Sequence, residues 1–440
     1  MTKQTLVLGG IGIFIALNTH QLSAQKPLLE LIPKGKQIAE RTIESDQPMW
    51  GRIKTNENYL AIIGRPDPKN QNQISKVSLY DLDGSLLWKK ELKFISEVEL
   101  APESDKVIVS YRSGYHMYNN ICFDQNGNQL WEIPNLNRLI TMGPGGKYGI
   151  TSSSGSEDNL IHIYDLETGT ELETTLPDRY SFYRARFIDA RRVVYLLEYF
   201  ETTRNEEALN LLRKMKREGK INLRKKPTKP IPNTWNITKY PVRYIIYDIP
   251  TQTILTDTEL FSPSGESLHL YVHTTSDHTS ISPDKQHIAL VLRYLKYNKN
   301  MNFTIIEVDM QGNVKWETSD RLSGHTKGVY DVGNGKLLLD LYQSYQLVDR
   351  GSGKTLWLYK PDLDGSSEYY QSFIQDNQLI LQTRGNGKLR VHTLNFSTGD
   401  VIQNDEYIED EAFVLKTLDN TVIYNKTRKQ LQFIKSEGLR

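Results

Sequence analysis

Three histidines form the only histidine cluster in the sequence, and histidine is a common metal ligand. His269, His273 and His278 fall around a predicted inner strand and the turn after it. In an extended strand, which rises about 3.3 Å per residue, His269 and His273 share a face but lie about 13 Å apart. That separation is too large for one metal ion. We therefore predict structural or surface roles for these side chains and no metal site.

An acidic loop is the second candidate for a metal site. Asp362, Asp364 and Glu368 surround Gly365 and two serines, and carboxylate oxygens are the ligands that calcium prefers. The segment lacks the twelve-residue spacing of a full calcium loop. We interpret it as an ordinary turn between two repeats, with calcium binding as the alternative. No other cofactor is predicted.

The sequence offers few nucleophiles in a catalytic context. No Gly-x-Ser-x-Gly nucleophile elbow occurs in it, so it lacks the mark of the hydrolases that use that turn. Cys122 is the only cysteine, which excludes an internal disulfide. Its place within a predicted strand favours a small buried residue.

The strongest concentration of charge lies between residues 202 and 239. Apolar residues recur there at the spacing of one helix face: Ala208, Leu211, Leu212 and Met215. Gly219 ends this predicted helix, which begins near Arg204. The segment from 213 to 229 carries nine cations against the single acid Glu218: Arg213, Lys214, Lys216, Arg217, Lys220, Arg224, Lys225, Lys226 and Lys229. Two interpretations stay open: a solvated helix that decorates the fold, and an arm that binds anions on a protein, glycan or lipid headgroup.

The rest of the chain is organised by a repeated hairpin. In four copies, an Asp or Asn leads to a turn glycine, and a tryptophan follows four residues later: Gly84 and Trp88, Gly127 and Trp131, Gly312 and Trp316, Gly353 and Trp357. Four weaker copies have turns at positions 169, 252, 399 and 438. Glycine accepts the positive φ of such a turn, and tryptophan supplies apolar surface between neighbouring sheets.

The spacing of the hairpins indicates the fold. Most of the eight turn positions are 39 to 46 residues apart, close to the roughly 40 to 45 residues of a β-propeller blade. An apolar strand and an inner strand precede each hairpin, which gives four strands per blade. The 83-residue step from 169 to 252 is interpreted as blade 4, interrupted between its strands B and C by a helical insertion at about 202–239. We predict an all-β fold over residues 25–440, a single eight-bladed β-propeller, with seven blades as the alternative.

The two ends of the repeat are expected to meet. The last hairpin stops at Gly438 without an outer strand, and residues 36–43 belong to no other blade. We predict that residues 36–43 complete the eighth blade and thereby remove an exposed sheet edge.

Bulk composition and the first residues bear on location. A chain of 440 residues is too long for one compact core. Its net charge of +1 gives it no global attraction to nucleic acid, so no nucleic-acid partner is expected. Residues 1–24 have an early cation, Lys3, an apolar stretch of about 12 residues that is shorter than the roughly 20 needed to cross a bilayer, and a small residue, Ala24, at the end. We predict a signal peptide cleaved after Ala24, no transmembrane segment after cleavage, and a periplasmic or extracellular protein, as a monomer or part of a complex.

Several motifs resemble known propellers. The Gly-to-Trp hairpins resemble the repeat of the quinoprotein-like propellers, and residues 322–332 with Asp349 resemble a WD repeat. Residues 282–289 are similar to a turn of the TolB-like and dipeptidyl-peptidase propellers. The resemblance implies the fold, and it implies for quinone enzymes a calcium-bound cofactor over a vicinal cysteine pair. Cys122 alone cannot form that pair, so quinone catalysis is not expected.

Propeller topology also predicts which face of the ring carries the binding site. Loops between strands B and C emerge on the same side as the connections between blades, and here these loops are basic and rich in tyrosine. The predicted binding residues on this rim are Arg65, Arg112, His116, Arg213, Lys216, Arg217, Lys225, Lys296, Lys299 and Arg384. The sequence favours a non-catalytic binding or assembly module that engages a protein or an anionic polymer through this rim. The competing hypothesis is a lyase, hydrolase or quinoprotein-like enzyme that acts in the central channel.

Overall fold

The computed structural model describes most of the chain after residue 35. The described residues are 36–44, 48–56, 58–64, 74–114, 117–136, 140–151, 153–154, 161–174, 182–217, 235–270, 278–294, 302–318, 322–323, 328–341, 344–361, 368–375, 377–385, 388–408, 412–416, 420–425 and 430–437.

The described strands form nine sheets, eight of which contain four or more strands. Sheet 1 contains β2 (Pro48–Thr55), β3 (Tyr59–Gly64), β4 (Ile74–Asp81) and β5 (Leu86–Lys93). Sheet 2 contains β6 (Ile95–Leu100), β7 (Val107–Gly114), β8 (Met117–Phe123) and β9 (Gln129–Leu136). Sheet 3 contains β10 (Ile140–Met142), β11 (Tyr148–Thr151), β13 (Ile163–Asp165) and β14 (Thr170–Leu172), with a short 3₁₀ helix at Pro144–Gly146. Sheet 4 contains β12 (Ser153–Ser154), β15 (Phe182–Phe187), β16 (Arg192–Glu198), β19 (Arg243–Asp248) and β20 (Thr253–Glu259).

The second half of the chain continues in the same way. Sheet 5 contains β21 (Leu268–Leu270), β22 (Thr279–Ile281), β23 (His287–Tyr294), β24 (Asn302–Asp309), β25 (Val314–Glu317) and β26 (Leu322–Ser323). Sheet 6 contains β27 (Gly328–Asp331), β28 (Lys336–Asp340), β29 (Tyr345–Asp349) and β30 (Thr355–Tyr359). Sheet 7 contains β31 (Glu368–Gln375), β32 (Gln378–Gly385), β33 (Lys388–Asn395) and β34 (Val401–Ile408). Sheet 8 contains β35 (Ala412–Lys416), β36 (Asn420–Asn425), β37 (Gln430–Glu437) and β1 (Lys36–Glu44).

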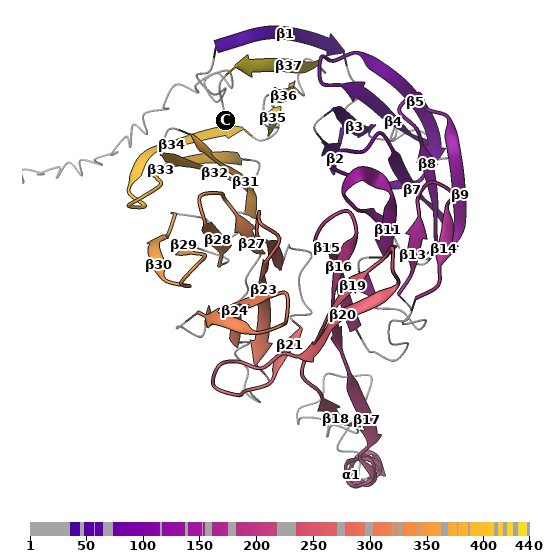
Figure 1. Ribbon diagram of the computed structural model, residues 1–440, viewed down its shortest axis with the longest axis vertical. Coiled ribbons are helices and arrows are strands. Elements are labelled where there is room, and N and C mark those ends of the chain that lie inside the picture. Colours follow the sequence, from indigo (N-terminus) through magenta and orange to yellow (C-terminus); the bar gives the residue numbers. More distant parts are fainter. Residues whose placement is uncertain are drawn as a thin grey trace, which may run out of the picture.

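These eight sheets follow one another around a ring in chain order (Figure 1). Buried apolar clusters lie between consecutive sheets, for example between sheets 1 and 2 and between sheets 4 and 5. The core is thus divided into several small ones, which is how a chain of this length avoids a single oversized core. The eight apolar strands predicted to precede the hairpins are present as β3, β7, β11, β16, β23, β28, β32 and β36.

Sheet 8 joins the two ends of the described chain. β1 pairs antiparallel with β37, with Arg41 opposite Phe433 and Ile43 opposite Leu431. This confirms the predicted pairing of residues 36–43 with the last hairpin. The pairing covers an edge that would otherwise offer free backbone groups to other chains.

The turn glycines and the tryptophans of the repeat contact each other across neighbouring sheets. Gly127, Gly353 and Gly399 have φ of +80°, +69° and +77°, and a Cβ added at each would lie 2.5 to 2.8 Å from the ring of the tryptophan in the preceding sheet. Each tryptophan therefore packs flat against the next hairpin turn, where a side chain would collide with it. The prediction that tryptophan fills the space between sheets is confirmed.

The contacts between tryptophan and turn differ with the length of the turn. In the longer turns the glycine follows its Asp or Asn by four residues, and the indole Nε1 donates to a turn carbonyl: Trp131 to Leu166 at 2.8 Å, Trp316 to Arg350 at 2.6 Å and Trp357 to Phe396 at 3.0 Å. The shorter turn at Gly127, which faces Trp88, lacks the extra residue. The buried Nε1 of Trp88 has no hydrogen-bond partner among the described residues.

A ninth, two-stranded sheet interrupts sheet 4. β17 (Phe200–Arg204) pairs with β18 (Trp235–Lys239), and between them lies α1 (Glu206–Arg217). Figure 1 shows this hairpin and α1 projecting outward from the ring beyond β20. The sequence predicted a helix that begins near Arg204, but the structure places Arg204 in β17, and α1 begins two residues later because Asn205 caps it: the Asn205 carboxamide oxygen accepts from the Ala208 amide at 3.0 Å.

Candidate functional site at the root of the insertion

The predicted binding residues do not gather into one described patch. Arg65, His116, Lys225, Lys296 and Lys299 lie outside the described residues, as do Asp362 and Asp364 of the acidic loop. Arg384 lies in β32, Glu368 begins β31 and Lys216 lies in α1. The three whose side chains are described, Arg112, Arg213 and Arg217, are exposed. Figure 1 shows α1 far from β7, which carries Arg112.

The helix α1 presents cations and a partly exposed apolar stripe. Arg213, Lys214 and Arg217 are exposed, and the Arg213 guanidinium donates to Asn210 at 3.1 Å. None of the apolar stripe residues is fully buried, and Leu211 is 50% exposed. An amphipathic helix whose apolar face is not buried in the described structure is a surface suited to a partner.

A paired stalk holds α1 away from the ring. β17 and β18 pair from Phe200 with Lys239 to Arg204 with Trp235. The Tyr240 amide also donates to the Tyr199 carbonyl at 3.1 Å, which extends the ladder to the edge of sheet 4. Because its backbone groups are paired, the stalk is a defined element and not a loose loop.

A pocket of about 520 Å³ opens at the root of this stalk. The insertion contributes Tyr199, Glu201, Tyr240 and Pro241, and sheet 4 contributes Arg243, Asp257, Thr258 and Glu259. Arg243 forms a salt bridge and two hydrogen bonds with Asp257, whose Oδ1 accepts from Nε at 2.5 Å. The hydrogen bond to Asp257 raises the pKa of Arg243, and Tyr199 contributes a smaller rise in the same direction. Partial burial of the guanidinium opposes this rise.

Hydrogen bonding also orients the second tyrosine of the pocket. The Tyr240 hydroxyl is hydrogen-bonded to Glu201, which raises its pKa above the ordinary value because the carboxylate stabilises the protonated phenol. The pocket thus contains two oriented phenol rings, three carboxylates and one guanidinium. These groups can bind a polar or cationic ligand.

A buried pair of an acid and a histidine links sheets 4 and 5 next to Tyr199 of the pocket. Glu198 and His269 are both 0% exposed, with Oε1 3.3 Å from Nδ1. Burial lowers the pKa of nearby Lys239, while Glu198 raises it and Arg293 lowers it further. Glu198 and Lys239 are thus the sequence neighbours of Tyr199 and Tyr240, the two tyrosines that line the pocket.

The histidines of sheet 5 have structural roles. His269 pairs with Glu198 of sheet 4, and buried His278 contacts the Arg184 guanidinium through Nδ1 at 2.5 Å. His273 lies outside the described residues. His269 and His278 are both buried, and each contacts a side chain of sheet 4.

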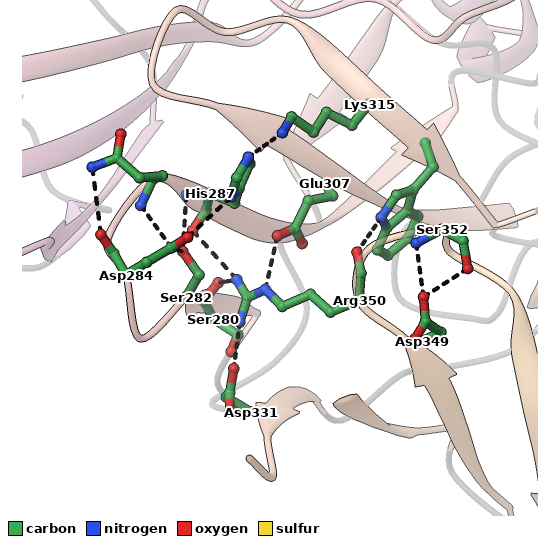
Figure 2. Close-up of polar contacts among 12 residues, drawn as sticks. Ser280, Ser282, Asp284, His287, Glu307, Lys315, Asp331, Asp349, Arg350 and Ser352 are labelled. Atoms are coloured by element: carbon green, nitrogen blue, oxygen red, sulfur yellow. Dashed lines mark hydrogen bonds and ion pairs between the residues drawn. The ribbon is translucent and has the colours of Figure 1, made fainter. Parts of the chain in front are cut away.

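A second buried network fastens sheet 5 to sheet 6 (Figure 2). Arg350, 7% exposed, donates to Glu307 at 2.8 Å, to Asp331 at 2.5 Å and to the carbonyl oxygens of Ser280 and His287 at 3.0 and 3.3 Å. Burial raises the pKa of Glu307 to about 7, although Arg350 acts to lower it. Since these groups are enclosed between sheets, we interpret them as an inter-sheet staple.

The described residues contain no group of three or more His, Cys, Asp and Glu side chains arranged to hold a metal ion. Cys122 is buried in β8, and burial raises the pKa of its thiol to about 12. At neutral pH it is a protonated, inert thiol, in agreement with the prediction of a small buried residue. No helix in the described part of the chain is long and apolar enough to span a membrane.

Sequence reasoning missed the pocket. Its residues come from both ends of the insertion and from the last two strands of sheet 4, so they converge only in the fold. One signal was available: Tyr199 and Tyr240 flank the insertion. The exposed positions of Asp257 and Glu259 in β20 follow only from the structure.

Comparisons with known proteins bear on the fold. No protein-family model and no curated protein matches the sequence. Among solved structures, BamB from Moraxella catarrhalis is 12% identical and covers 91% of this chain and 99% of its own, with a TM-score of 0.50. The Dos1 propeller is 10% identical, with 90% and 94% covered and a TM-score of 0.52, and Sqt1 from Saccharomyces cerevisiae is 9% identical, with 91% and 99% covered and a TM-score of 0.50.

The ring of sheets, the repeated turn chemistry and these similarities define the class of the molecule. The chain is a β-propeller repeat protein, as the sequence predicted. At such low identities the similarity concerns the fold, and function has to be argued from the insertion and the pocket.

Proposed function

We propose that this protein is an exported, non-catalytic propeller that binds a partner protein through the insertion on sheet 4. The observation that carries the proposal is α1 itself, held by a paired stalk outside the ring, with exposed cations and a partly exposed apolar face. Propellers commonly present such decorations on a rigid scaffold. The partner surface that fits α1 is acidic and has apolar side chains that cover Leu211.

The blade count belongs to the same proposal. Each of the eight larger sheets corresponds to one blade, β1 supplies the outer strand of the eighth, and the insertion separates the second and third strands of the fourth. A ring closed through β1 would hold its shape without disulfides, which suits an exported protein with one buried cysteine.

Export is proposed from the first 24 residues. Fractionation of cells that produce the full chain should place the protein outside the cytoplasm, with a mature N-terminus at Gln25. A cytoplasmic protein that retains Met1 would contradict export without affecting the proposed role of the insertion.

The stalk provides a direct test of partner binding. Because Arg204 and Trp235 are paired, residues 205–234 can be replaced by Asn-Gly, which closes the hairpin with a two-residue turn. We expect the wild-type protein to retain a defined partner from an envelope extract and the closed variant to lose it while its thermal unfolding is unchanged. Equal capture of that partner by both proteins would refute the role of the insertion.

The alternative of an enzyme acting in the central channel gains no support from a described catalytic group. The acid and histidine that most resemble a catalytic pair, Glu198 and His269, are fully buried between sheets 4 and 5. Substrate would have to separate the two sheets to reach them. We therefore favour binding over catalysis.

A further inference from the structure

The pocket at the root of the stalk is separate from α1 and differs from it in charge. Its charged lining consists of Glu201, Arg243, Asp257 and Glu259. Arg243 and Asp257 neutralise each other through their salt bridge. Glu201 and Glu259 remain as uncompensated negative charges. The pocket is therefore acidic, whereas the helix that projects above it is basic.

The arrangement of the acids follows from strand register. Arg243 of β19 lies directly opposite Glu259 of β20, and Asp257 is the diagonal neighbour on the same face. Asp257 takes the guanidinium. Glu259 is exposed and has no ion-pair partner among the described residues. It is thus available to a positively charged ligand.

Two tyrosines complete the lining. Tyr240 is 39% exposed and lines the pocket together with Glu201. Tyr199 lines it together with Arg243. Phenol rings attract cations to their faces, and carboxylates beside them strengthen this attraction. The pairing of Glu201 with Tyr240 places an acid and an aromatic ring next to each other, a combination that suits an ammonium or guanidinium group.

The neighbouring strand indicates what carries the cation. β20 is the last strand of sheet 4, and within the described structure it pairs with β19 alone. An edge strand offers backbone groups to an extended peptide, and side-chain pockets beside it give specificity. The pocket, with a volume of about 520 Å³, has room for one long side chain and parts of its neighbours.

We propose that this pocket binds the guanidinium or ammonium group of an extended basic peptide segment lying beside β20. The cation is held between Glu201 and Glu259, with the ring of Tyr240 against it. This second site is independent of α1 and selects a partner segment of the opposite charge from the one that α1 would bind.

The test compares two peptides of equal size with the mature protein. Acetyl-Ala-Arg-Ala-amide carries the cation, and the same peptide with citrulline replaces the guanidinium by a neutral urea. Calorimetric titration at low ionic strength should show saturable binding of the arginine peptide and much weaker binding of the citrulline peptide. Glu201→Gln and Glu259→Gln should each weaken arginine-peptide binding about twofold to fivefold, and Tyr240→Leu by a similar factor.

Matched controls separate this site from the rest of the protein. Glu207→Gln changes an exposed carboxylate in α1 and should leave the affinity unchanged. The variant in which Asn-Gly replaces residues 205–234 keeps the lining of the pocket and should still bind the peptide, so the two proposals can fail separately.

Several results would overturn the inference. They are the absence of binding to the wild-type protein, equal binding of the two peptides, and full affinity in the variant that combines Glu201→Gln with Glu259→Gln. Saturable binding of a neutral disaccharide without binding of the arginine peptide would assign the pocket to a sugar and would also refute it.

Discussion

Trp357 and Trp88 occupy equivalent places in the repeat and differ in one hydrogen bond. Each is 7% exposed and lies against a turn glycine of the next sheet, Gly399 or Gly127. The Nε1 of Trp357 donates to the Phe396 carbonyl at 3.0 Å, whereas the buried Nε1 of Trp88 has no partner among the described residues. Replacing each by phenylalanine removes a similar apolar area, so the packing losses nearly cancel in the comparison.

The expected difference follows from the hydrogen bond alone. Trp357→Phe loses a bond with a net contribution of about 1 kcal/mol, and Trp88→Phe relieves an unsatisfied buried donor that costs about 1 to 3 kcal/mol. The free energy of unfolding should therefore fall about 2 to 4 kcal/mol further for Trp357→Phe than for Trp88→Phe.

Urea unfolding followed by far-ultraviolet circular dichroism measures both variants, with the m-value used to check that the cooperativity is unchanged. Equal losses for Trp357→Phe and Trp88→Phe, or a larger loss for Trp88→Phe, would refute the account of how turn length controls the contact between sheets.

Three further predictions concern the turns and the staple between sheets 5 and 6. Gly353→Ala should destabilise the protein more than Gly265→Ala, because both have positive φ but an added Cβ lies 2.6 Å from a tryptophan ring at Gly353 and meets nothing within 4 Å at Gly265; equal urea midpoints would show that the close contact relaxes at no cost. Burial raises the pKa of Glu307 from 4.5 to about 7, so its contribution to stability is fully present below about pH 4.5 and is lost as the pH rises through 7; Glu307→Gln should flatten the unfolding free energy over this range, and an unchanged slope would exclude Glu307 as the group responsible. Arg350→Met should cost about 3 to 5 kcal/mol because it leaves a buried acid unpaired, whereas Arg191→Met, which removes one ion pair of a side chain that is 62% exposed, should cost less than about 1 kcal/mol; similar losses in thermal or urea unfolding would contradict the staple.

Much of the fold could be predicted because its determinants are local. The turn glycines need positive φ, and the sequence shows them at blade spacing, with φ of +83° at Gly84 and Gly312 in the structure. Position 252 follows the same frame without glycine, and there Gln252 adopts a φ of +53°. The hairpin turn therefore adopts a positive φ at this position even when the residue is not glycine.

The candidate site could be predicted only in part. The helix was visible because its apolar spacing is local, but its stalk depends on pairing between Phe200 and Lys239, which are 39 residues apart. The pocket depends on that same pairing, and the buried Glu198 and His269 pair depends on contact between two sheets. Such groupings of ionisable residues leave no periodic signal in the sequence, whereas the cations of the rim are evident from local composition.

The central claim is that α1 contacts a partner protein. A photo-crosslinking amino acid at Leu211 in α1, 50% exposed, can be compared with the same amino acid at Leu358 in β30, 51% exposed. The account predicts a specific crosslinked partner from Leu211 in intact cells and none from Leu358. Crosslinking of that partner from Leu358 with none from Leu211 would contradict the claim.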